Sequence, residues 1–528
     1  MKKQLLYILL FATAFLIALP MCNKVWQPYD EGWIVTSASI VSHGGMPYRD
    51  FFVMQGPGQF FVLAFFYSLF GHLIIIGRLW TVFVYAMTCL SIYLLWEELC
   101  PKKPNFILYA VPLFALIPRL GASPWPIWPA VALTLWSTVA FAKFIKKNSG
   151  VYLIIAGILS GLTFLFRYDF GIYIFLAQAV VLAIWLKTQL KGSARRSSFK
   201  TASAFIAYFL AVFSVICLSA IFFGYKAALK DLIFDLFVFP FKYHMSSFSL
   251  SFPGFCFNPL MLFYNGNYFV NINQFYFPIV IYILGLWFIL AVVKELKIRL
   301  IALQVLLVGV FQFYNVMIRP DVMHLLSSIV PSYVLAAAVL FWLKKYAGRK
   351  NVYKTVYYIL VIFLIVFTVK NMDKYIKNGY RKAFMGKMVQ AEFKCGKIYI
   401  PREDADDTRS VVEYIQKHTL SSEKIYIATI PHGASEGNDS ILYFLSERLP
   451  CTKYFMQHPG LLCVHDIRQD IIASIKKNAK LIVLAQSDVA IRDANRKSEI
   501  CGSQIDECIE KNFSLVKKIG RYGVYLAK

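Results

Sequence analysis

Long apolar runs recur along the first 370 residues of the chain and predict membrane-spanning helices. The hydrocarbon core of a bilayer is about 30 Å thick, so a helix needs about 20 apolar residues to cross it. Eleven such runs occur, at 5–21, 79–97, 106–120, 124–142, 151–167, 171–187, 201–223, 275–293, 299–318, 324–343 and 354–370. The pattern therefore predicts an α-helical polytopic membrane protein with about 11 transmembrane helices.

The segment 59–76 is also apolar enough to cross, and the charges of the connecting loops decide against it. If it does not cross, five loops on the N-terminal side carry 18 lysines and arginines, whereas the opposite loops carry six. Basic loops of membrane proteins face the cytoplasm. The N-terminus is therefore expected in the cytoplasm, and 59–76 is expected to lie along the outer interface. The first run ends without an A-x-A-like cleavage site, so we interpret it as a retained span.

From Asn371 onward the pattern becomes that of a soluble protein. Helices are expected at 408–418, 440–448 and 466–477, and strands at 424–429, 481–485 and 522–526. Strands that alternate with helices indicate a small α/β domain over 371–528, after a transmembrane domain over 1–370. Eleven preceding spans place it outside the cytoplasm. It has no glycine-rich phosphate loop, so we interpret it as a lid, an acceptor platform or a partner surface.

Composition agrees with a membrane protein. The chain is 58% hydrophobic and 16% charged, whereas a soluble domain is about a quarter charged. The net charge of +26 would suggest nucleic acid in a soluble protein, but here the basic residues lie in short loops, so no nucleic-acid partner is expected. The ten cysteines form no CxxC pair and predict no structural metal site. Cys451 with Cys463, or Cys501 with Cys508, are candidate disulfides, and free buried thiols are an equally good interpretation.

Three polar groups lie at the ends of predicted spans, all on the non-cytoplasmic side. They are Asp30-Glu31, Arg167-Tyr168-Asp169, and Arg319-Pro320-Asp321 with His324. Ionisable side chains are costly near lipid and are kept where water, a cation or chemistry uses them. Segments that converge at one depth predict a site between helix ends. Taken singly, the acidic pair also suits the start of a helix, and each Arg–Asp pair suits an ion pair at the interface.

The stretch from Tyr29 to Arg78 carries a specific set of motifs. The set is Tyr29-Asp30-Glu31-Gly32, Gly45-Met46-Pro47-Tyr48-Arg49-Asp50-Phe51, Gly56-Pro57-Gly58, Phe70-Gly71 and Gly77-Arg78-Leu79. It resembles the first external loop of polyprenyl-phosphate-dependent glycosyltransferases of the GT-C superfamily. It is similar to protein O-mannosyltransferases, the lipid A aminoarabinose transferase and the lipopolysaccharide-core galacturonosyltransferases. The resemblance extends loosely over 1–370 and implies the GT-C fold.

The resemblance also implies a reaction, namely inverting transfer of a sugar from a polyprenyl-phosphate donor to a hydroxyl group. Asp30 would be the general base and Glu31 its acidic neighbour. A base must accept the proton of the attacking hydroxyl, and cations must stabilise the departing phosphate. The candidate phosphate-binding residues are Arg49, Arg167, Arg319 and His324, and the supporting residues are Tyr48, Asp50, Asp169 and Asp321. Arg49 and Asp50 also suit a simple pair in the turn after Pro47.

No cofactor is expected, and with several arginines available a divalent cation is not favoured, although some relatives use one. The implied partners are the polyprenyl-phosphate donor, membrane lipid, and an envelope glycan, lipid or protein acceptor. The expected location is a bacterial cytoplasmic (inner) membrane.

The aromatic, asparagine-rich loop 223–274 suits either a position at the membrane interface or carbohydrate binding. Two other function classes stay open, a transporter or flippase for lipid-linked saccharides and a non-catalytic scaffold.

Overall fold

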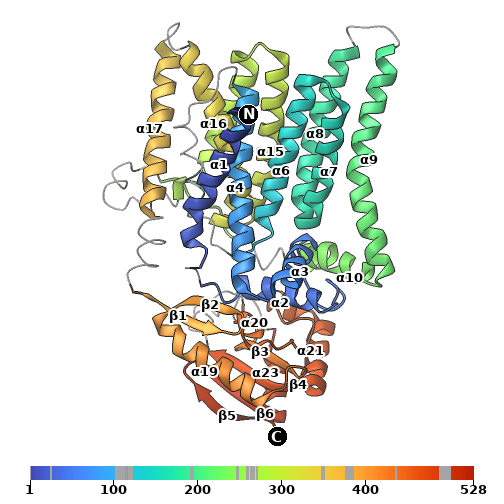
Figure 1. Cartoon of the computed structure of the whole chain (residues 1–528), viewed down its shortest axis with the longest axis vertical. Helices are drawn as coiled ribbons and strands as arrows, with labels where there is room; N and C mark the ends of the chain where they lie inside the picture. Colours follow the sequence, from blue (N-terminus) through green and yellow to red (C-terminus); the bar gives the residue numbers. More distant parts are fainter. Residues whose placement is uncertain are drawn as a thin grey trace.

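The computed structural model shows a long helical bundle standing on a smaller region of sheets and short helices (Figure 1). It describes residues 2–23, 26–100, 113, 116, 123–190, 196–244, 249–256, 258, 261, 268, 272–346, 351–374, 386–433, 437–458, 460–486 and 501–528.

Ten helices of the described residues run along the bundle. They are α1 (Lys2–Ala18), α4 (Ile74–Leu99), α6 (Ile127–Lys147), α7 (Gly150–Phe166), α8 (Tyr168–Leu190), α9 (Arg196–Tyr225), α14 (Phe277–Trp287) with its π-helical continuation η5 (Phe288–Val292), α15 (Leu296–Ile318), α16 (Val322–Tyr346) and α17 (Asn351–Lys374). Eight of them are long and apolar enough to cross a membrane, and α7 and the α14–η5 unit are shorter. The polytopic helical fold predicted from the apolar runs is confirmed.

Each of these helices coincides with one predicted span. The remaining predicted span, 106–120, lies outside the described residues apart from Leu113 and Leu116, so the number of eleven stays a prediction. The predicted boundary between 370 and 371 also stays a prediction, because 375–385 is not described.

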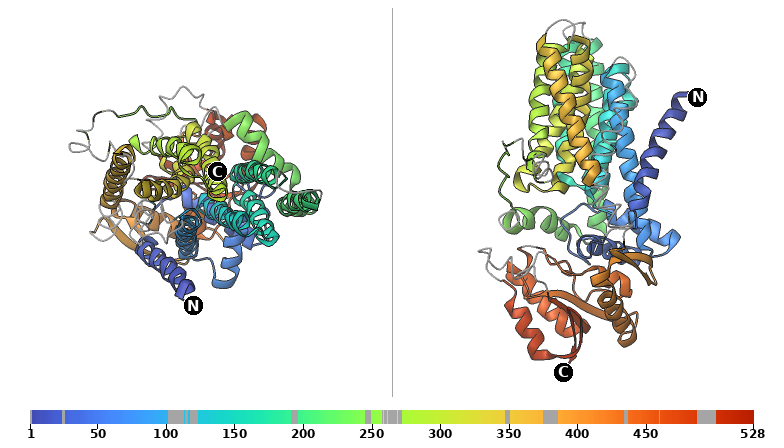
Figure 2. Two further views of the ribbon diagram at one scale, coloured as in Figure 1. Left: turned by 90° about the horizontal axis from the view of Figure 1, so that it is seen from above. Right: turned by 90° about the vertical axis from the view of Figure 1, so that its left-hand side faces the viewer.

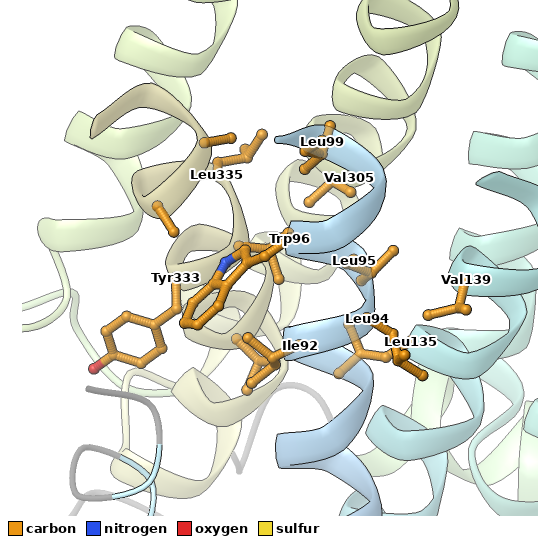
Figure 3. Packing of buried hydrophobic residues seen from close by; sticks show 14 of the residues in the cluster. Ile92, Leu94, Leu95, Trp96, Leu99, Leu135, Val139, Val305, Tyr333 and Leu335 are labelled. Carbon is orange, nitrogen blue, oxygen red and sulfur yellow. The ribbon is translucent and has the colours of Figure 1, made fainter. Parts of the chain in front are cut away.

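Helix α4 lies in the middle of the bundle and is packed on several sides (Figure 3). Its Trp96 is almost fully buried. Tyr333 and Leu335 of α16 lie on one side of α4, and Leu135 and Val139 of α6 lie on the other. Burial of this kind explains why the sequence of α4 is apolar around its whole circumference, not only along one stripe.

A buried glutamine joins four helices of the bundle. The side chain of Gln178 on α8 donates to Ser137 on α6 at 2.8 Å and accepts from Ser160 on α7 at 3.0 Å and from Tyr208 on α9 at 2.7 Å. Close approach of α7 to α9 requires Gly157, where a Cβ would lie 2.9 Å from the carbonyl oxygen of Tyr208. Small residues and polar contacts between helices are how membrane bundles gain specificity.

Two short helices lie between the bundle and the sheets, namely α2 (Asp30–Ser42) and α3 (Gly58–Phe70) (Figure 1). With 13 residues, α3 spans about 20 Å and is too short to cross a membrane. The segment 59–76 therefore does not form a span of its own, as the loop charges indicated. Its last residues, 74–76, differ from the prediction because they already belong to α4.

The C-terminal region contains a four-stranded sheet with strand order β3-β4-β6-β5. Strands β3 (Lys424–Ile430) and β4 (Ala479–Gln486) are parallel, whereas β6 (Tyr522–Ala527) is antiparallel to β4 and to β5 (Phe513–Ile519). The helices α19 (Arg402–His418), α20 (Ile441–Ser446), α21 (His465–Asn478) and α23 (Ser503–Asn512) accompany it. The predicted α/β character and all six predicted elements are confirmed.

Four elements of this region were not predicted. Two of them, β1 (Met388–Phe393) and β2 (Gly396–Pro401), form a separate antiparallel hairpin. The other two are α23 and β5. The burial pattern of β5 explains one of these omissions. Its five central residues are all exposed, so it lacks the apolar alternation that marks a strand.

Neither of the two candidate disulfides, Cys451–Cys463 and Cys501–Cys508, is formed. Cys463 is bonded to Cys501, which joins the turn before α21 to the start of α23. Cys451 and Cys508, the other members of the two candidate pairs, are free and buried, as the alternative interpretation expected. Spacing along the chain does not show which cysteines meet after folding.

The start of α1 and the C-terminal sheets lie toward opposite ends of the molecule (Figures 1 and 2). Helix α1 runs along the outside of the bundle and leads toward α2.

Candidate functional site

A cavity of about 710 Å³ lies where the bundle meets the C-terminal region. It is lined by ionisable residues from three separate segments that the sequence singled out. These residues are Asp30, Arg167, Asp169, Arg319, Asp321 and His324. The structure therefore brings together six of the ten predicted site residues.

Asp30 owes its position to the tight contact between α2 and α20. Gly32, two residues further along α2, touches the backbone of Ile441 so closely that a Cβ would clash with its nitrogen. The same Ile441 nitrogen donates to the carbonyl oxygen of Pro28 at 2.9 Å. These contacts fix the first turn of α2 against the C-terminal region, with Asp30 as its first residue facing the cavity.

The environment of Asp30 favours the protonated form. Burial, followed by the negative charge of nearby Asp321, raises the pKa of Asp30 from 3.8 to about 6, while Arg319 opposes the shift. A carboxylate with a pKa near the working pH accepts and releases a proton readily. The pKa of Asp30 therefore suits a group that exchanges a proton near neutral pH.

Arg319, Pro320 and Asp321 form a rigid link between α15 and α16. Oδ1 of Asp321 accepts the backbone N–H groups of Met323 and His324 at 2.9 and 2.8 Å, so Asp321 caps the N-terminus of α16. Its Oδ2 accepts Arg319 Nε at 3.0 Å and bonds His324 Nδ1 at 2.8 Å. Burial would raise the pKa of Asp321, but the bonds and charges of His324 and Arg319 outweigh burial and lower it.

Arg167 and Asp169 form a second anchored pair at the junction of α7 and α8. Two nitrogens of the Arg167 guanidinium donate to the two oxygens of Asp169, at 2.9 and 2.6 Å. Asn315 of α15 donates to Asp169 at 2.7 Å, and Tyr173 donates to Asn315 at 3.2 Å. A guanidinium has five N–H donors, so this pair orients Arg167 without exhausting it.

Glu31 does not reach the cavity, which corrects the expectation of an acidic pair at the site. Its carboxylate accepts Nε and Nη2 of Arg78 on α4, both at 2.7 Å, and both side chains are fully buried. Nη1 of Arg78 also donates to Asn23 at 2.9 Å. Glu31 therefore joins α2 to α4 and acts in the fold, not at the cavity.

Removal of one partner from this buried pair is expected to be strongly destabilising. Arg78→Ala leaves the Glu31 carboxylate without its counter-ion in a dry environment, which should cost about 3–5 kcal/mol. Denaturant unfolding in detergent measures this cost. The double variant Glu31→Leu/Arg78→Met removes both charges and should be closer to wild type. A cost below about 1 kcal/mol for Arg78→Ala would contradict the structural role of the pair.

Tyr48, Arg49 and Asp50 also lie away from the cavity. Arg49 donates twice to Asp50, at 2.9 and 2.7 Å, in a partly exposed turn, so the expected role of Arg49 in phosphate binding is replaced by the simple pairing. Buried Tyr48 donates to the carbonyl oxygen of Gln55 at 3.0 Å. The motif shapes the loop that places Met54 and Gln55 in the cavity wall.

Gly56 links this loop to the arginine at the end of α7. Its nitrogen donates to the carbonyl oxygen of Phe166 at 3.2 Å, and a Cβ at Gly56 would clash with the backbone of Leu165. The motif Gly56-Pro57-Gly58 therefore packs directly beside Arg167, which explains why the loop needs glycine there.

Several lining residues were not predicted. His244 lies at the end of the π-helical segment η4 (Pro240–His244), and partly buried His458 comes from the C-terminal region, with the two ring centroids 4.9 Å apart. Burial, together with the charges of His244 and Arg319, lowers the pKa of His458 well below its usual value. The aromatic walls include Trp33 and Trp125, whose rings meet edge to face at 6.3 Å. The sequence did not indicate a role for His458, because a single histidine in the C-terminal region belongs to no recognisable motif.

The loop 223–274 is only partly described, and 265–267 and 271 lie outside the described residues. Asn273 exchanges hydrogen bonds with the backbone of Cys256 at 3.0 and 3.1 Å, so it closes the loop. No group of three or more His, Cys, Asp or Glu side chains that could hold a metal ion occurs in the described part of the chain.

Part of the chain matches a known protein family, which tests the resemblance stated for Tyr29–Arg78. Residues 54–219 match the family described as Dolichyl-phosphate-mannose-protein mannosyltransferase. The matched residues cover less than a third of the chain and include the motifs from Gly56 to Arg78. The resemblance predicted from Tyr29–Arg78 is thereby confirmed. No curated protein matches the chain.

Solved structures of two proteins match the chain at low sequence identity. ArnT from Cupriavidus metallidurans bound to undecaprenyl phosphate has 13% identity and a TM-score of 0.47, covering 99% of this chain and 98% of that chain. Its apo state has 11% identity and a TM-score of 0.47, with coverages of 99% and 97%. The Archaeoglobus fulgidus oligosaccharyltransferase in complex with Zn and sulfate has 10% identity and a TM-score of 0.45, with coverages of 90% and 68%.

Proposed function

We propose that this protein is a GT-C glycosyltransferase that moves a sugar from a polyprenyl-phosphate donor to a hydroxyl group of an acceptor, with inversion at the anomeric carbon. The observation that carries the proposal is the single cavity shared by Asp30, Arg167 and Arg319, which come from three distant segments. One carboxylate with a raised pKa and two anchored guanidinium groups are the groups that such a transfer needs.

The bond changes balance within this site. The acceptor oxygen attacks the anomeric carbon and gives its proton to the carboxylate of Asp30. The bond between the anomeric carbon and the phosphate oxygen breaks, and polyprenyl phosphate departs with the bonding electrons. Attack opposite to the leaving group inverts the configuration, which requires the base and the cations to lie on different sides of the sugar.

The two arginines suit the departing phosphate because both are held in place before the reaction. Asp169 orients Arg167, and Asp321 orients Arg319. Positioned donors stabilise developing charge without the cost of reorganisation. His324 shares Asp321 with Arg319 and lies in the same wall of the cavity, so we include it as a further phosphate ligand.

A lipid-linked donor fits the surroundings of the cavity. An apolar cavity of about 620 Å³ is lined by residues of α14 and α15, among them Ile283, Leu306 and Val310, and it shares Tyr314 with the reaction cavity. An isoprenoid chain in this apolar cavity would place its phosphate beside Arg319. The family that residues 54–219 match is described by a dolichyl-phosphate-linked sugar.

We further propose that the cavity faces the outside of a bacterial cytoplasmic membrane, with the N-terminus in the cytoplasm, and that transfer needs no metal ion. The loop charges support the orientation. Arginine side chains supply positive charge that does not depend on a bound cation. A chelator is accordingly expected to leave transfer unchanged.

Reconstitution of the full chain in proteoliposomes tests the reaction. Synthetic polyprenyl-phosphate, polyprenyl-diphosphate and nucleotide donors carrying one sugar are compared, with envelope extract as acceptor. We expect release of polyprenyl phosphate and a product whose anomeric configuration, determined by NMR, is opposite to that of the donor. Transfer from the nucleotide donor, or retention of configuration, would contradict the proposal.

A further inference from the structure

The wall of the cavity opposite the bundle is built by the four-stranded sheet of the C-terminal region. Thr429 of β3 and Ala485 and Gln486 of β4 line the cavity, and all three lie at the carboxyl ends of these parallel strands. Arg521, in the turn between β5 and β6, joins them. Ligands bind outside the carboxyl ends of strands in sheets of this kind, because loops and free backbone groups gather there.

A charge-balanced cluster lies at this edge. Arg521 Nη2 donates to Oδ2 of Asp439 at 2.8 Å, and the hydroxyl of Tyr522 donates to the same oxygen at 2.7 Å. The Arg521 backbone is held as well, because its nitrogen donates to Asp407 at 3.2 Å and its carbonyl oxygen accepts the nitrogen of Gln486 at 3.0 Å. A fixed guanidinium thus faces the cavity with its charge offset by a carboxylate.

A buried amide beside the cluster has an unused acceptor. Asn438 is 2% exposed and lines the cavity. Its Nδ2 donates to the carbonyl oxygens of Ile427 and Phe455 at 2.7 and 2.9 Å, which fixes the amide plane. Its Oδ1 has no hydrogen-bond partner among the described residues. A buried polar atom without a partner is costly, and a donor group of a ligand would relieve that cost.

We propose that Asn438, Asp439, Gln486 and Arg521 form the acceptor subsite, and that the acceptor is a neutral, hydroxyl-rich glycan. This inference rests on the proposed function, because it places the acceptor opposite the arginines assigned to the donor phosphate. The subsite offers amide and carboxylate acceptors together with guanidinium and amide donors. Such a mixture matches sugar hydroxyls, each of which both donates and accepts. An anionic acceptor would need an excess of positive charge, and a bare serine or threonine would use only a part of the subsite.

Binding of neutral trisaccharides to the full chain in nanodiscs tests the inference. Maltotriose, chitotriose and mannotriose serve as probes in saturation-transfer NMR, with tri-galacturonate and a threonine-rich peptide as the anionic and protein-like alternatives. We expect at least one neutral trisaccharide to bind the wild type. Arg521→Gln should weaken this binding about tenfold or more, as expected for the loss of hydrogen bonds to a charged group. Gln486→Ala removes an uncharged, exposed hydrogen-bonding group and should weaken binding about 3- to 10-fold.

One control variant, Lys518→Gln, and the choice of Gln486→Ala as second test variant keep the result interpretable. Lys518→Gln removes a positive charge from an exposed position of the same hairpin and should leave binding unchanged. Gln486→Ala removes an exposed side chain and retains the backbone bond to Arg521, so it should fold even if Arg521→Gln does not. Thermal unfolding of every variant separates lost binding from lost structure.

The outcomes separate this inference from the proposed function. Asp30→Asn should keep trisaccharide binding while transfer is lost. Binding that Gln486→Ala and folded Arg521→Gln leave unchanged would overturn the subsite, even if Asp30 proves essential for transfer. Failure of every neutral trisaccharide to bind, or binding of only the anionic or peptide probe, would overturn the acceptor class. Full transfer by Asp30→Asn, with binding lost in Arg521→Gln, would instead overturn the proposed base.

Discussion

Asp30→Asn is expected to lower the turnover number by about 10²- to 10⁴-fold, the usual contribution of a general base. Asparagine has nearly the same shape and retains an oxygen toward the cavity, but it cannot accept the proton of the attacking hydroxyl. The affinity for the donor should change little, because the assigned phosphate ligands lie on other segments. Initial rates at saturating donor measure the effect.

The pH dependence of the wild type gives an independent test of the same group. Only the carboxylate form of Asp30 accepts a proton, so the rate should rise with pH through a midpoint near the pKa of about 6 and then level off. In Asp30→Asn this acidic limb should disappear from whatever activity remains. A midpoint near 4, the ordinary value of an aspartate, would mean that burial does not act on the catalytic group.

The stability of this variant distinguishes a lost base from a lost fold. The pKa of Asp30 is raised on folding, so the protonated group stabilises the fold at low pH, and this contribution is lost as pH rises through about 6. At pH 8 the buried charge opposes folding, and asparagine removes it. Asp30→Asn should therefore unfold at the same or a higher temperature than wild type. Asp406→Asn, at a well-exposed carboxylate on α19, is the matched control and should change neither rate nor stability.

The convergence of Asp30, Arg167 and Arg319 could be predicted because it depends mainly on topology. Hydropathy gives the spans, loop charges give their orientation, and the orientation decides which helix ends share a side. Each of these properties is local in sequence and needs no knowledge of packing. The same reasoning could not show how far apart the three side chains lie.

The error at Glu31 has a simple geometric cause. Successive residues of an α-helix point about 100° apart, so two adjacent residues at the start of α2 need not face the same surroundings. The alternative interpretation of the pair as the start of a helix already allowed one of the two acids to face away from the site. Which of the two faces Arg78 depends on the contact of α2 with α4 and could not be read from the motif.

The contribution of the C-terminal region was not predictable for a different reason. Asp439 and Arg521 are 82 positions apart, and neither lies in a recognisable motif. Their meeting depends on the strand order β3-β4-β6-β5, which places the turn before β6 beside the end of β4. Strand order in a mixed sheet is set by long-range packing, so local pattern does not determine it.

Arg319→Gln is expected to lower the turnover number by about 10²- to 10³-fold, comparable to the loss of one donor that stabilises a developing anion. The side chain would keep a polar group but lose its charge and the planar fork that suits a phosphate. Arg319→Lys restores the charge without the fork and should recover only part of the loss. A donor analogue without the sugar, polyprenyl phosphate itself, should bind more weakly to both variants.

The acidic limb of the pH profile shows whether Arg319 acts electrostatically at Asp30 as well. Arg319 lowers the pKa of Asp30, so its removal should move the midpoint of the limb to higher pH. Asp321 raises the same pKa, so Asp321→Asn should move the midpoint to lower pH, while the asparagine oxygen still caps α16. Opposite shifts from two side chains that are bonded to each other cannot result from a general loosening of the loop. Shifts in the same direction would therefore contradict a shared site in which base and phosphate ligands are coupled through their charges.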